Sequence, residues 1–520
     1  MVKHLIALNY LVGRVTMSSE NTDLNQREKR GLSRRQMLGA GAVAVAGVTA
    51  LQADAPHLGI PQASAQTAGS MVRPSANFLF SNGQQMQSLR RGVQVMKSRP
   101  FEDPTSWAYQ AAIHGYGFAP PAGLPQDMVA NMSNCIHGPE GFQRYFLPWH
   151  RLYLHYFERI LRAASGDPGL TLPYWNYSQA GGAAIPLGFR WPADTGNALY
   201  NGNRNRFEGG GFQPSININR GDPLPPNYTD IRPAMSAFGY DRFSDVLEQG
   251  VHGNVHVGVG GRDQFGVGGD MSGFNTAALD PIFWLHHCNV DRLWSRWLDS
   301  SGNNNPASNA WRDRQFSFYD ENGQRVQRFV ADAADTRTLG YTYDDEPFNS
   351  FIGFESVVMA SRGESGGIEE ELAASENAIS LTGRREKVAV TPTDSPAAES
   401  QGAGLFFTEQ DAADSRPVIL RLAGIDYEGA PGYLYEIYVN MPDGTGREEA
   451  APYYAGTLAP FGLAGSPLPL DIDISGLLNR QIEKELFLGG QVTVEFIPAG
   501  VGEDEEAAEI TVAAISLVRP

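Results

Sequence analysis

The sequence predicts a mainly α domain followed by an antiparallel β-sandwich domain, and three shifts in pattern along its 520 residues indicate this. Residues 66–345 are rich in Trp, Phe and Pro, and their apolar residues recur at helical spacing between Gly- and Asn-rich loops. Residues 346–416 turn to Ser, Glu, Ala and Gly, as is typical of a linker. Residues 417–520 alternate short β-branched runs with Gly, Pro and Asp turns. Each domain is long enough to bury its own core.

The predicted strands of the last region can be read directly in the sequence. The runs are "PVILRLAGI", "YLYEIYVNM", "LPLDIDI", "QVTVEFI" and "EITVAAISLV". Their regular separation by turn residues favours a sandwich. Within the linker, "EKVAVTP" is the one run with strand character, and we expect at most an edge strand there.

The amino-terminal residues 1–65 resemble an export signal of the twin-arginine type. Arg34 and Arg35 precede an apolar run, and small residues place a cleavage site after Ala65. The run is broken by Gly, Gln and Asp and is shorter than the about 20 residues that span a bilayer. We therefore expect the twin-arginine machinery to deliver the folded chain to the periplasm or the exterior. A start at Met17 instead of Met1 would leave this expectation unchanged.

The charge of the chain excludes some partners. The formal net charge is −18 and the pI is near 5.0. Nucleic acids and anionic membrane surfaces would be repelled, because binding to them depends on attraction to phosphates. Small neutral ligands remain compatible with this charge.

Histidine is confined to one part of the chain. Of ten histidines, two lie in the signal region and none follows residue 287. A single buried histidine is usually a satisfied core residue, but this confinement predicts a shared role. The eight are His114, His137, His150, His155, His252, His256, His286 and His287.

Two motifs place histidines on helix faces. In "VHGNVH", His252 and His256 are four residues apart, so both rings leave one face of a helix. In "DPIFWLHHCNVDRLW", residues 280–294, an Asp-Pro pair fits the helix start. His287 lies on the continuous face of that helix, and His286 lies about 100° away. We therefore expect His287 to be a metal ligand, with Asp291, one turn on, as a hydrogen-bond acceptor behind it.

The other histidines form a second group. In "CIHGPEGFQRYFLPWHRLYLHYFERIL", His150 begins a predicted helix and His137 precedes it in a loop. His155 is off the apolar face and is interpreted as a surface or packing residue. His114 ends another predicted helix, capped by Gly115. Two triads of neutral imidazoles without carboxylate or thiolate suit copper or zinc, and the pairing favours two coppers that bind dioxygen.

At these segments the sequence resembles the type 3 copper family of tyrosinases, catechol oxidases and hemocyanins. "YQAAIHG", "CIHG", "FLPWHRLYLHYFE", "LEQGVHGNVH" and "DPIFWLHHCNVDRLW" carry the resemblance. It implies a four-helix bundle around a dicopper site. The implied ligands are His114, His137 and His150 for one copper, and His252, His256 and His287 for the other. "LGYTYDD" resembles the tyrosine motif that closes this domain, which would stack Tyr343 on Arg73.

The spacing between His137 and His150 departs from the family. The resemblance implies an insertion of about four residues between these two ligands, within "GPEGFQRY". Cys135 matches the position of a thioether to the ligand histidine, here His137, in fungal tyrosinases and molluscan hemocyanins. A disulfide between Cys135 and Cys288 is the alternative in an exported chain. Otherwise Cys288 is interpreted as a small buried apolar residue.

The resemblance also implies roles near the coppers. Glu248 matches a water-holding or proton-accepting glutamate of plant polyphenol oxidases, the alternative being a solvated helix carboxylate. Phe274 matches an aromatic gate above the second copper. Gly253 stands where several tyrosinases have an asparagine proposed to help deprotonate monophenols. These features favour catechol oxidation to o-quinones over tyrosine hydroxylation. A tyrosinase, an o-aminophenol oxidase and a hemocyanin-like oxygen carrier are the alternatives.

The carboxy-terminal region is similar, more loosely, to that of plant polyphenol oxidases, which follows a linker and shields the site. We expect a side chain between Tyr453 and Phe461 to cover the copper site, giving a latent enzyme that an activating protease would release. A stabilising or carbohydrate-contacting domain is the alternative. The expected partners are a small phenol, dioxygen and a copper chaperone, with no nucleic acid and no membrane span in the mature chain.

Overall fold

The structure is a computed structural model of the chain, in which residues Gln66–Pro520 form one compact unit. It describes residues 71–79, 83–140, 143–207, 215–262, 268–300, 302–344, 370–392, 417–428, 431–461, 463, 469–487, 491–500 and 508–519. The predicted export signal and parts of the predicted linker lie outside the described residues.

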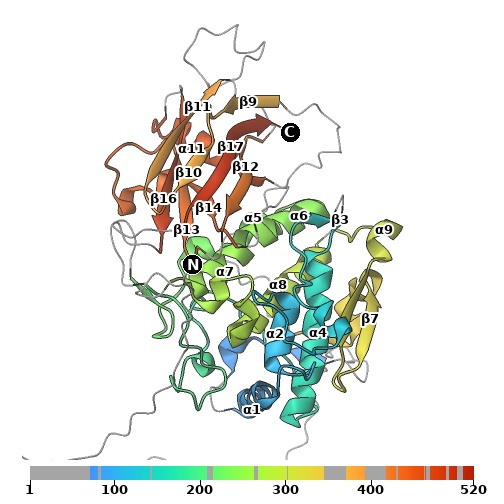
Figure 1. Cartoon of the computed structure of the whole chain (residues 1–520). Coiled ribbons are helices and arrows are strands. Elements are labelled where there is room, and N and C mark those ends of the chain that lie inside the picture. The colour runs from blue at the N-terminus through green and yellow to red at the C-terminus, as the bar shows by residue number, and fades with distance from the viewer. Residues whose placement is uncertain are drawn as a thin grey trace, which may run out of the picture. The chain divides into compact units, whose positions relative to one another are not determined.

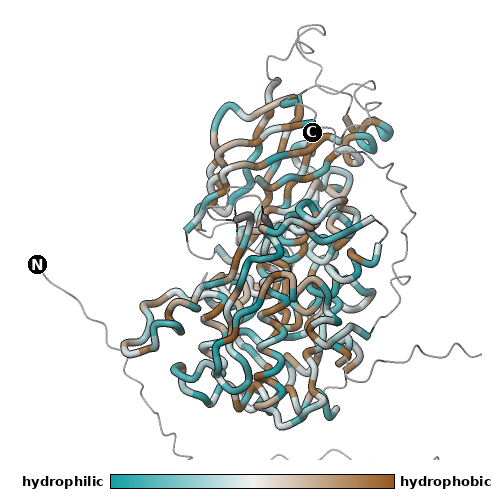
Figure 2. Tube along the Cα trace, turned by 90° about the vertical axis from the view of Figure 1, so that its right-hand side faces the viewer, coloured by the Kyte–Doolittle hydropathy of each residue, from teal (hydrophilic) through white to brown (hydrophobic). Residues whose placement is uncertain are grey.

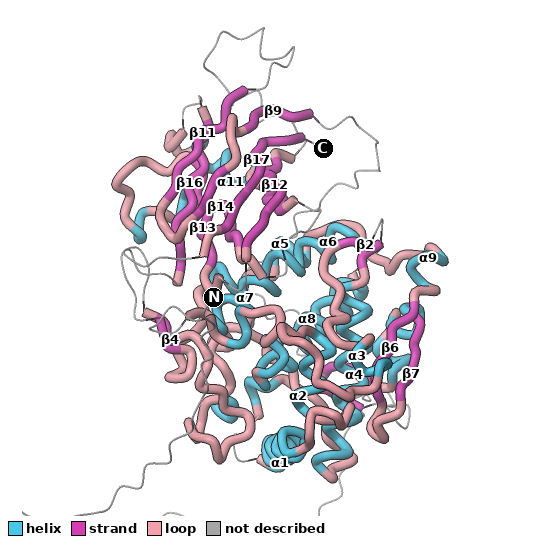
Figure 3. Tube along the Cα trace, viewed as in Figure 1, coloured by secondary structure: helices cyan, strands magenta, loops and turns pink. Residues whose placement is uncertain are grey.

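The amino-terminal domain is helical, as predicted (Figures 1 and 3). Its longest helices belong to the segments that the histidine motifs mark. The helices of this domain are α1 Gln84–Ser98, α2 Trp107–His114, α3 Gln126–Val129, α4 Phe146–Ser165, α5 Arg232–Met235, α6 Tyr240–Leu247, α7 Gly253–Gly260, α8 Pro281–Asp299 and α9 Asn309–Arg312.

The helix boundaries follow local chemistry. The Asp280 carboxylate accepts a hydrogen bond from the backbone N–H of Ile282 at 3.0 Å, and Pro281 is the first residue of α8, as predicted. Helix α2 begins after Ser106, whose hydroxyl accepts from the N–H of Tyr109, and it ends at His114 with Gly115 as cap. A five-residue π turn, Glu248–His252, joins α6 to α7.

Short strand pairs complete the helical domain. β1 (Met71–Arg73) pairs in parallel with β8 (Tyr341–Tyr343), which brings the two ends of the domain together. The other pairs are antiparallel: β2 (Pro139–Glu140) with β3 (Gln143–Arg144), β4 (Arg206–Phe207) with β5 (Ile216–Asn217), and β6 (Gln315–Tyr319) with β7 (Arg325–Phe329).

The carboxy-terminal domain is an antiparallel sheet with strand order β14-β13-β16-β11-β9-β17-β12-β15, and β10 pairs with β17. A Cβ atom added to Gly456 of β14 would lie 3.0 Å from Cδ1 of Ile472 in β15, so the two end strands approach each other. The strands therefore form one sheet that nearly closes into a barrel. They are β9 Glu370–Ala374, β10 Ile379–Leu381, β11 Glu386–Pro392, β12 Ile419–Tyr427, β13 Leu434–Val439, β14 Tyr454–Leu458, β15 Leu470–Asp473, β16 Val492–Ala499 and β17 Ile510–Arg519, with helix α11 Ser475–Glu483.

The predicted linker boundary is wrong. Strands β9, β10 and β11 fall within residues 346–416, and β11, the "EKVAVTP" run, pairs with β16 on one side and β9 on the other. It is an interior strand, not an edge strand. The polar composition of this region led to the linker prediction because the apolar runs of these strands are short.

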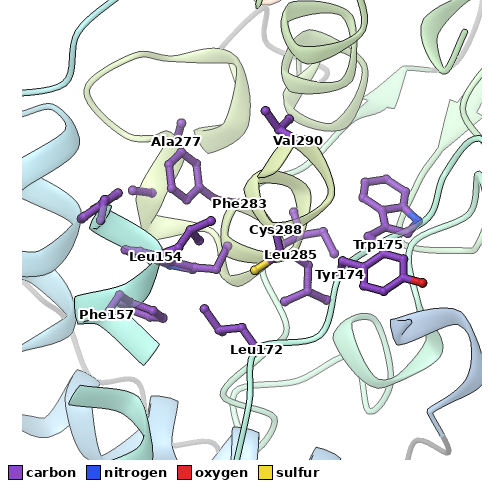
Figure 4. Close-up of a cluster of buried hydrophobic side chains, with 14 of the residues drawn as sticks. Leu154, Phe157, Leu172, Tyr174, Trp175, Ala277, Phe283, Leu285, Cys288 and Val290 are labelled. Atoms are coloured by element: carbon purple, nitrogen blue, oxygen red, sulfur yellow. The ribbon is translucent and has the colours of Figure 1, made fainter. Parts of the chain in front are cut away.

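Each domain has its own core, and the helical core also takes in residues of the sheet domain. Figure 2 shows apolar residues, in brown, recurring along the elements of both domains. Cys288 lies among buried apolar side chains of the helical core, with Leu154, Leu172 and Tyr174 nearby (Figure 4), as its interpretation as a small apolar residue predicts. Leu434, Ala459, Phe461 and Ala499 of the sheet domain belong to that same core.

A search of the described residues found no helix both long and apolar enough for a membrane span.

Candidate metal centre

The predicted ligands converge from five separate segments of the helical domain. His114 ends α2, His150 lies in the second turn of α4, and His287 lies in the middle of α8. His252 ends the π turn and His256 follows on α7. His137 comes from the loop before β2. His155 is on α4 but outside this group, where its ring packs edge-on against Tyr156.

The ring positions bring the two predicted triads face to face. Within the second triad the ring centroids of His252 and His256 are 4.6 Å apart, and those of His252 and His287 are 5.1 Å apart. Within the first triad His114 is 6.0 Å from His137 and 5.8 Å from His150. The closest approach joins the triads: the rings of His150 and His287 stack at 4.1 Å.

Five of the six rings are oriented through Nδ1. Nδ1 of His114 bonds the carbonyl of Phe274 at 3.1 Å, and Nδ1 of His256 bonds that of Met271 at 2.9 Å. Nδ1 of His150 and of His252 each bonds the carbonyl four residues earlier, at 2.8 and 3.0 Å. A carbonyl accepts only from N–H, so these rings carry the proton on Nδ1 and leave Nε2 with a free lone pair. Nδ1 of His137 meets the Glu248 carboxylate instead.

The free Nε2 atoms fit a metal. Nε2 of His114 and of His252 are buried and have no hydrogen-bond partner among the described residues. Nε2 of His256 lies 3.2 Å from Nε2 of His287. Two nitrogen lone pairs repel each other at this distance unless a proton or a cation lies between them. Buried polar atoms without partners are rare in native proteins and point to an ion or ordered water. Neutral nitrogen donors of this kind suit copper.

Burial keeps the ligands neutral. It lowers the pKa of His114 to about 3, with a further contribution from the neighbouring His137. Burial likewise lowers the pKa of His150, His252, His256 and His287 well below the ordinary value for histidine. A metal ion would therefore meet no competition from protons on these four rings near neutral pH.

Cys135 lies between two rings of the first triad. Its Sγ is 3.4 Å from Nε2 of His137 and 3.4 Å from Nε2 of His150. Burial raises the pKa of the thiol, so it is protonated and a poor metal ligand. Cys135 and Cys288 are both free, and the alternative of a disulfide between them is not formed.

The Glu248 side chain forms hydrogen bonds at the first triad. Its Oε1 accepts from Nδ1 of His137 at 2.8 Å and from the backbone N–H of Gly138 at 3.0 Å, and the residue is 6% exposed. The alternative of a solvated carboxylate is therefore wrong. The carboxylate instead orients a predicted ligand.

Two phenylalanines pack beside the rings, and Phe274 does not lie where it was expected. Phe274 was expected above the second copper, but its ring packs against His114 at 4.9 Å and His137 at 5.2 Å, which belong to the first triad. Phe461 of the sheet domain stacks on His256, with centroids 3.7 Å apart and planes 9° apart. The aromatic cover of the second triad thus comes from the other domain.

Asp291 does not support His287 as expected. Nδ1 of His287 has no partner among the described residues, and Asp291 accepts from Arg151 at 2.5 Å and from Tyr341 at 2.6 Å. The guanidinium carbon of Arg73 is 3.7 Å from the ring centroid of Tyr341 and 5.9 Å from that of Tyr343. Arg73 therefore stacks mainly on Tyr341, not on Tyr343 as expected. One helical turn separates His287 from Asp291, but their side chains serve different neighbours.

One residue of the site escaped the sequence reasoning, and another was located only within a range. His286 lies with His252, His256 and His287 in one group of nitrogen atoms, all within 4.8 Å of one another. Its position beside His287 in the motif was visible, but the helix face alone assigned it elsewhere. Phe461 was within the range expected to cover the site, yet a single apolar residue in a turn gives no signal of its own.

Comparisons with protein families match most of the chain. Residues 104–219 and 217–300 match the common central domain of tyrosinase, and residues 307–351 match the polyphenol oxidase middle domain. Residues 369–520 match a domain of unknown function. The last boundary agrees with the start of β9, not with the predicted start at residue 417.

Individual relatives cover different parts of the chain. The tyrosinase HcTyr1 of Hahella sp. (strain CCB-MM4) is 32% identical over 479 residues, 82% of this chain and 95% of the relative. The chloroplastic polyphenol oxidase of Spinacia oleracea is 30% identical and matches 53% of this chain, and the chain spans about half of that relative, 47%.

Solved structures share the two-domain fold. A recombinantly expressed latent aurone synthase (polyphenol oxidase) superimposes with a TM-score of 0.56 at 23% identity, covering 87% of this chain and 90% of that structure. The latent apple tyrosinase gives a TM-score of 0.53 at 23% identity, covering 87% and 98%. At this identity the likeness establishes the fold alone.

Proposed function

Because the chain belongs to the tyrosinase and polyphenol oxidase family of type 3 copper proteins, we propose that this copper oxidoreductase oxidises o-diphenols to o-quinones. Two diphenols would reduce one dioxygen to two waters, which balances four electrons and four protons. The observation that carries the proposal is the meeting of two sets of three imidazoles, of which all but His137 are buried. Two copper ions held there would supply the electron transfer between phenol and dioxygen.

The residues around the rings have supporting roles in this proposal. The backbone carbonyls bonded to Nδ1 fix the rings so that Nε2 faces the metal positions. Glu248 is the carboxylate that contacts a ligand ring directly, so it is the group placed to exchange a proton there. Phe274 and Phe461 exclude water from the first and second triads.

Two features favour diphenols over monophenols as substrates. Gly253, next to His252, offers no amide that could join Glu248 in polarising a water. Glu248 already accepts from His137 and Gly138 through one oxygen, which leaves less capacity to deprotonate a phenol. A diphenol has a lower barrier because it needs no oxygen insertion.

A substrate panel tests this assignment. Copper-loaded protein would be assayed with catechol, o-aminophenol, tyramine and tyrosine, following both dioxygen consumption and product absorbance, with copper-depleted protein as the control. We expect catechol to react fastest and tyrosine to react slowly or not at all. Equal rates on tyrosine would assign a tyrosinase, and a faster reaction with o-aminophenol would assign that oxidase. Reversible dioxygen binding without turnover would assign an oxygen carrier.

We further propose that the intact chain is latent. The ring of Phe461 lies parallel to that of His256 and edge-on to those of His252 and His137, at 5.6 and 6.0 Å. A phenol ring approaching the second triad would need that space. Cutting between the domains or adding mild detergent should raise catechol oxidation several-fold. Unchanged rates would favour the alternative, a domain that only stabilises the fold.

We also propose that Cys135 forms a thioether with His137 in the mature protein. The thiol is free and its Sγ lies 3.4 Å from that ring. The crosslink would replace the S–H of Cys135 and a ring C–H of His137 with one C–S bond, and dioxygen would accept the two electrons and two protons. The intact protein would be lighter by two hydrogen atoms, and the crosslink would survive reduction. Peptide mapping of copper-loaded protein should join the peptide of Cys135 to that of His137. A crosslink to His150, which is equally close, would correct the partner, and an unmodified thiol would refute the crosslink.

A further inference from the structure

A seventh imidazole lies at the second triad. The nitrogen atoms of His286 belong to the same buried group as those of His252, His256 and His287. The ring of His286 is nearly parallel to that of His252, with centroids 5.4 Å apart and planes 13° apart. It is edge-on to that of His256 at 4.8 Å. His286 is therefore part of the site geometrically, although neither its helix face nor the family pattern makes it a ligand.

The polar atoms of His286 are unsatisfied. Both ring nitrogens are buried and have no hydrogen-bond partner among the described residues. A desolvated N–H and a desolvated lone pair without partners are each unfavourable. Four rings of the site bond a backbone carbonyl through Nδ1 at 2.8–3.1 Å, whereas His286 has a contact with the backbone of His252 that does not meet hydrogen-bond geometry.

His287, by contrast, is shared between the two halves of the site. It lies in a second group of nitrogen atoms, with His114 and His150, and stacks on His150 at 4.1 Å. When His287 contacts that side, the third nitrogen donor left to His252 and His256 among the described residues is His286. Three imidazoles are enough to hold a copper ion.

We propose that His286 is an auxiliary copper ligand, which with His252 and His256 forms a loading site for the first copper ion that the metal-free chain takes up. His287 would complete the second triad once both ions are bound. This inference rests on the proposed dicopper function, but it concerns metal uptake and not the oxidation of phenols.

Two substitutions distinguish a ligand from a residue that binds buried water. H286F keeps an aromatic ring against His252 but removes both nitrogens. H286N keeps polar atoms that can bond a water but is a poor copper donor. H155F is the matched control, because His155 is a histidine of α4 outside every group of nitrogen donors described above. Thermal unfolding of each metal-free variant verifies that it folds.

The experiment follows copper, not turnover. Metal-free full-length proteins receive one equivalent of Cu(II), and the uptake rate is measured by metal analysis after rapid separation. Nitrogen hyperfine structure in the electron paramagnetic resonance spectrum reports the ligands of the one-copper form. We expect H286F and H286N to take up the first copper at least about tenfold more slowly and to show an altered nitrogen pattern, with H155F unchanged.

The outcomes separate this inference from the proposed function. Wild-type uptake rates and spectra in both His286 variants would overturn the inference and leave the diphenol oxidase intact. Slow uptake in H286F with recovery in H286N would assign His286 to a buried water and also overturn the inference. If fully loaded wild-type protein bound two coppers without oxidising any diphenol, the proposed function would fail instead. If H286F fails to fold, the comparison of H286N with wild type decides alone.

Discussion

The carboxylate of Asp291 joins the helices of the site to the ends of the domain. It accepts from Arg151 of α4 at 2.5 Å and from Tyr341 of β8 at 2.6 Å, and the hydroxyl of Tyr343 also donates to it. Burial alone would raise its pKa, but the two guanidinium groups of Arg151 and Arg73 and the two tyrosines outweigh burial, and the pKa is lowered. The folded protein thus favours the ionised form of the Asp291 carboxylate.

Replacing Asp291 with Asn should therefore destabilise the protein. The substitution leaves Arg73 and Arg151 buried with less compensating charge, and breaking a buried pair typically costs about 3–5 kcal/mol. Urea unfolding at pH 7 measures the loss. D299N on the same helix is the control, because Asp299 is exposed and pairs only with Arg296 at the surface. Its effect should stay below about 1 kcal/mol.

The pH dependence of that loss has a defined sign. A carboxylate with a lowered pKa in the folded state contributes stability above its unfolded pKa of about 3.9, and the contribution is lost as pH falls through the folded pKa. The difference between wild type and D291N should therefore be constant near neutrality and shrink below about pH 4. A difference that grows on acidification would contradict the assignment.

Single residues also show how far sequence reasoning reached. The helix face in "DPIFWLHHCNVDRLW" placed His287 among the ligands because helical periodicity is local. The partners of Asp291 could not be predicted in the same way, since Arg151 lies 140 residues away and only the packing of α4 against α8 brings the two together. The local sequence pattern therefore identified a predicted metal ligand, whereas the hydrogen-bond partners of Asp291 depended on tertiary contacts.

At the scale of elements, the π turn between α6 and α7 links the two triads. π turns occur often at functional sites, where they shift the register of a helix. Within this one, the backbone of Gly250 leaves helical geometry, with φ −89° and ψ −112°. The carbonyl of Glu248 accepts from His252 of one triad, and its carboxylate accepts from His137 of the other. One residue thereby orients a ligand in each set.

Truncating Glu248 to alanine should weaken copper binding mainly at the first triad. The carbonyl contact to His252 persists in E248A, but His137 loses the acceptor that fixes its ring, and such losses typically cost 10- to 100-fold in metal affinity. Chelator competition on loaded protein should release one of the two ions early. E248Q, which keeps an acceptor oxygen, should recover much of the affinity, and D241A, exposed on α6, should match wild type. Equal loss of both ions would contradict a role confined to His137.

The strands of the sheet domain show a different limit of sequence reasoning. β12, β13, β16 and β17 were predicted because their alternating or β-branched residues bury one face. β9 and β10 were missed because they are short and lie in a polar stretch of the sequence, and both pair with β17. β11 was judged an edge strand because neighbours on both sides were not foreseeable from its own seven residues.

At the scale of the whole molecule, the two domains meet at the second triad through apolar and polar contacts. Ala459 packs near Gly253, where an added Cβ would touch it at 3.5 Å. The hydroxyl of Thr457 donates to Asn254 at 2.6 Å, and the amide of Asn227 donates to Glu436 at 3.1 Å. The ring of Phe461 and this polar interface would be separate causes of the proposed latency, and they can be tested separately.

Replacing Phe461 with alanine should activate the intact chain without proteolysis. The substitution clears the space over His256 while Thr457 still bonds Asn254, so catechol oxidation should rise several-fold and detergent should add little further. L486A is the matched control, because Leu486 is a partly exposed apolar residue of the sheet domain away from the site.

Breaking the polar interface should act differently. T457V leaves the Asn254 amide oxygen buried without a donor, at a cost of about 1–3 kcal/mol to the docked state. Since 1.4 kcal/mol is a factor of ten in an equilibrium, the ratio of undocked to docked chains would rise by about fivefold to about a hundredfold. Activation by T457V should therefore be sensitive to temperature and denaturant, whereas activation by F461A should not. If F461A stayed silent while T457V activated, the docking of the domain rather than one ring would close the site.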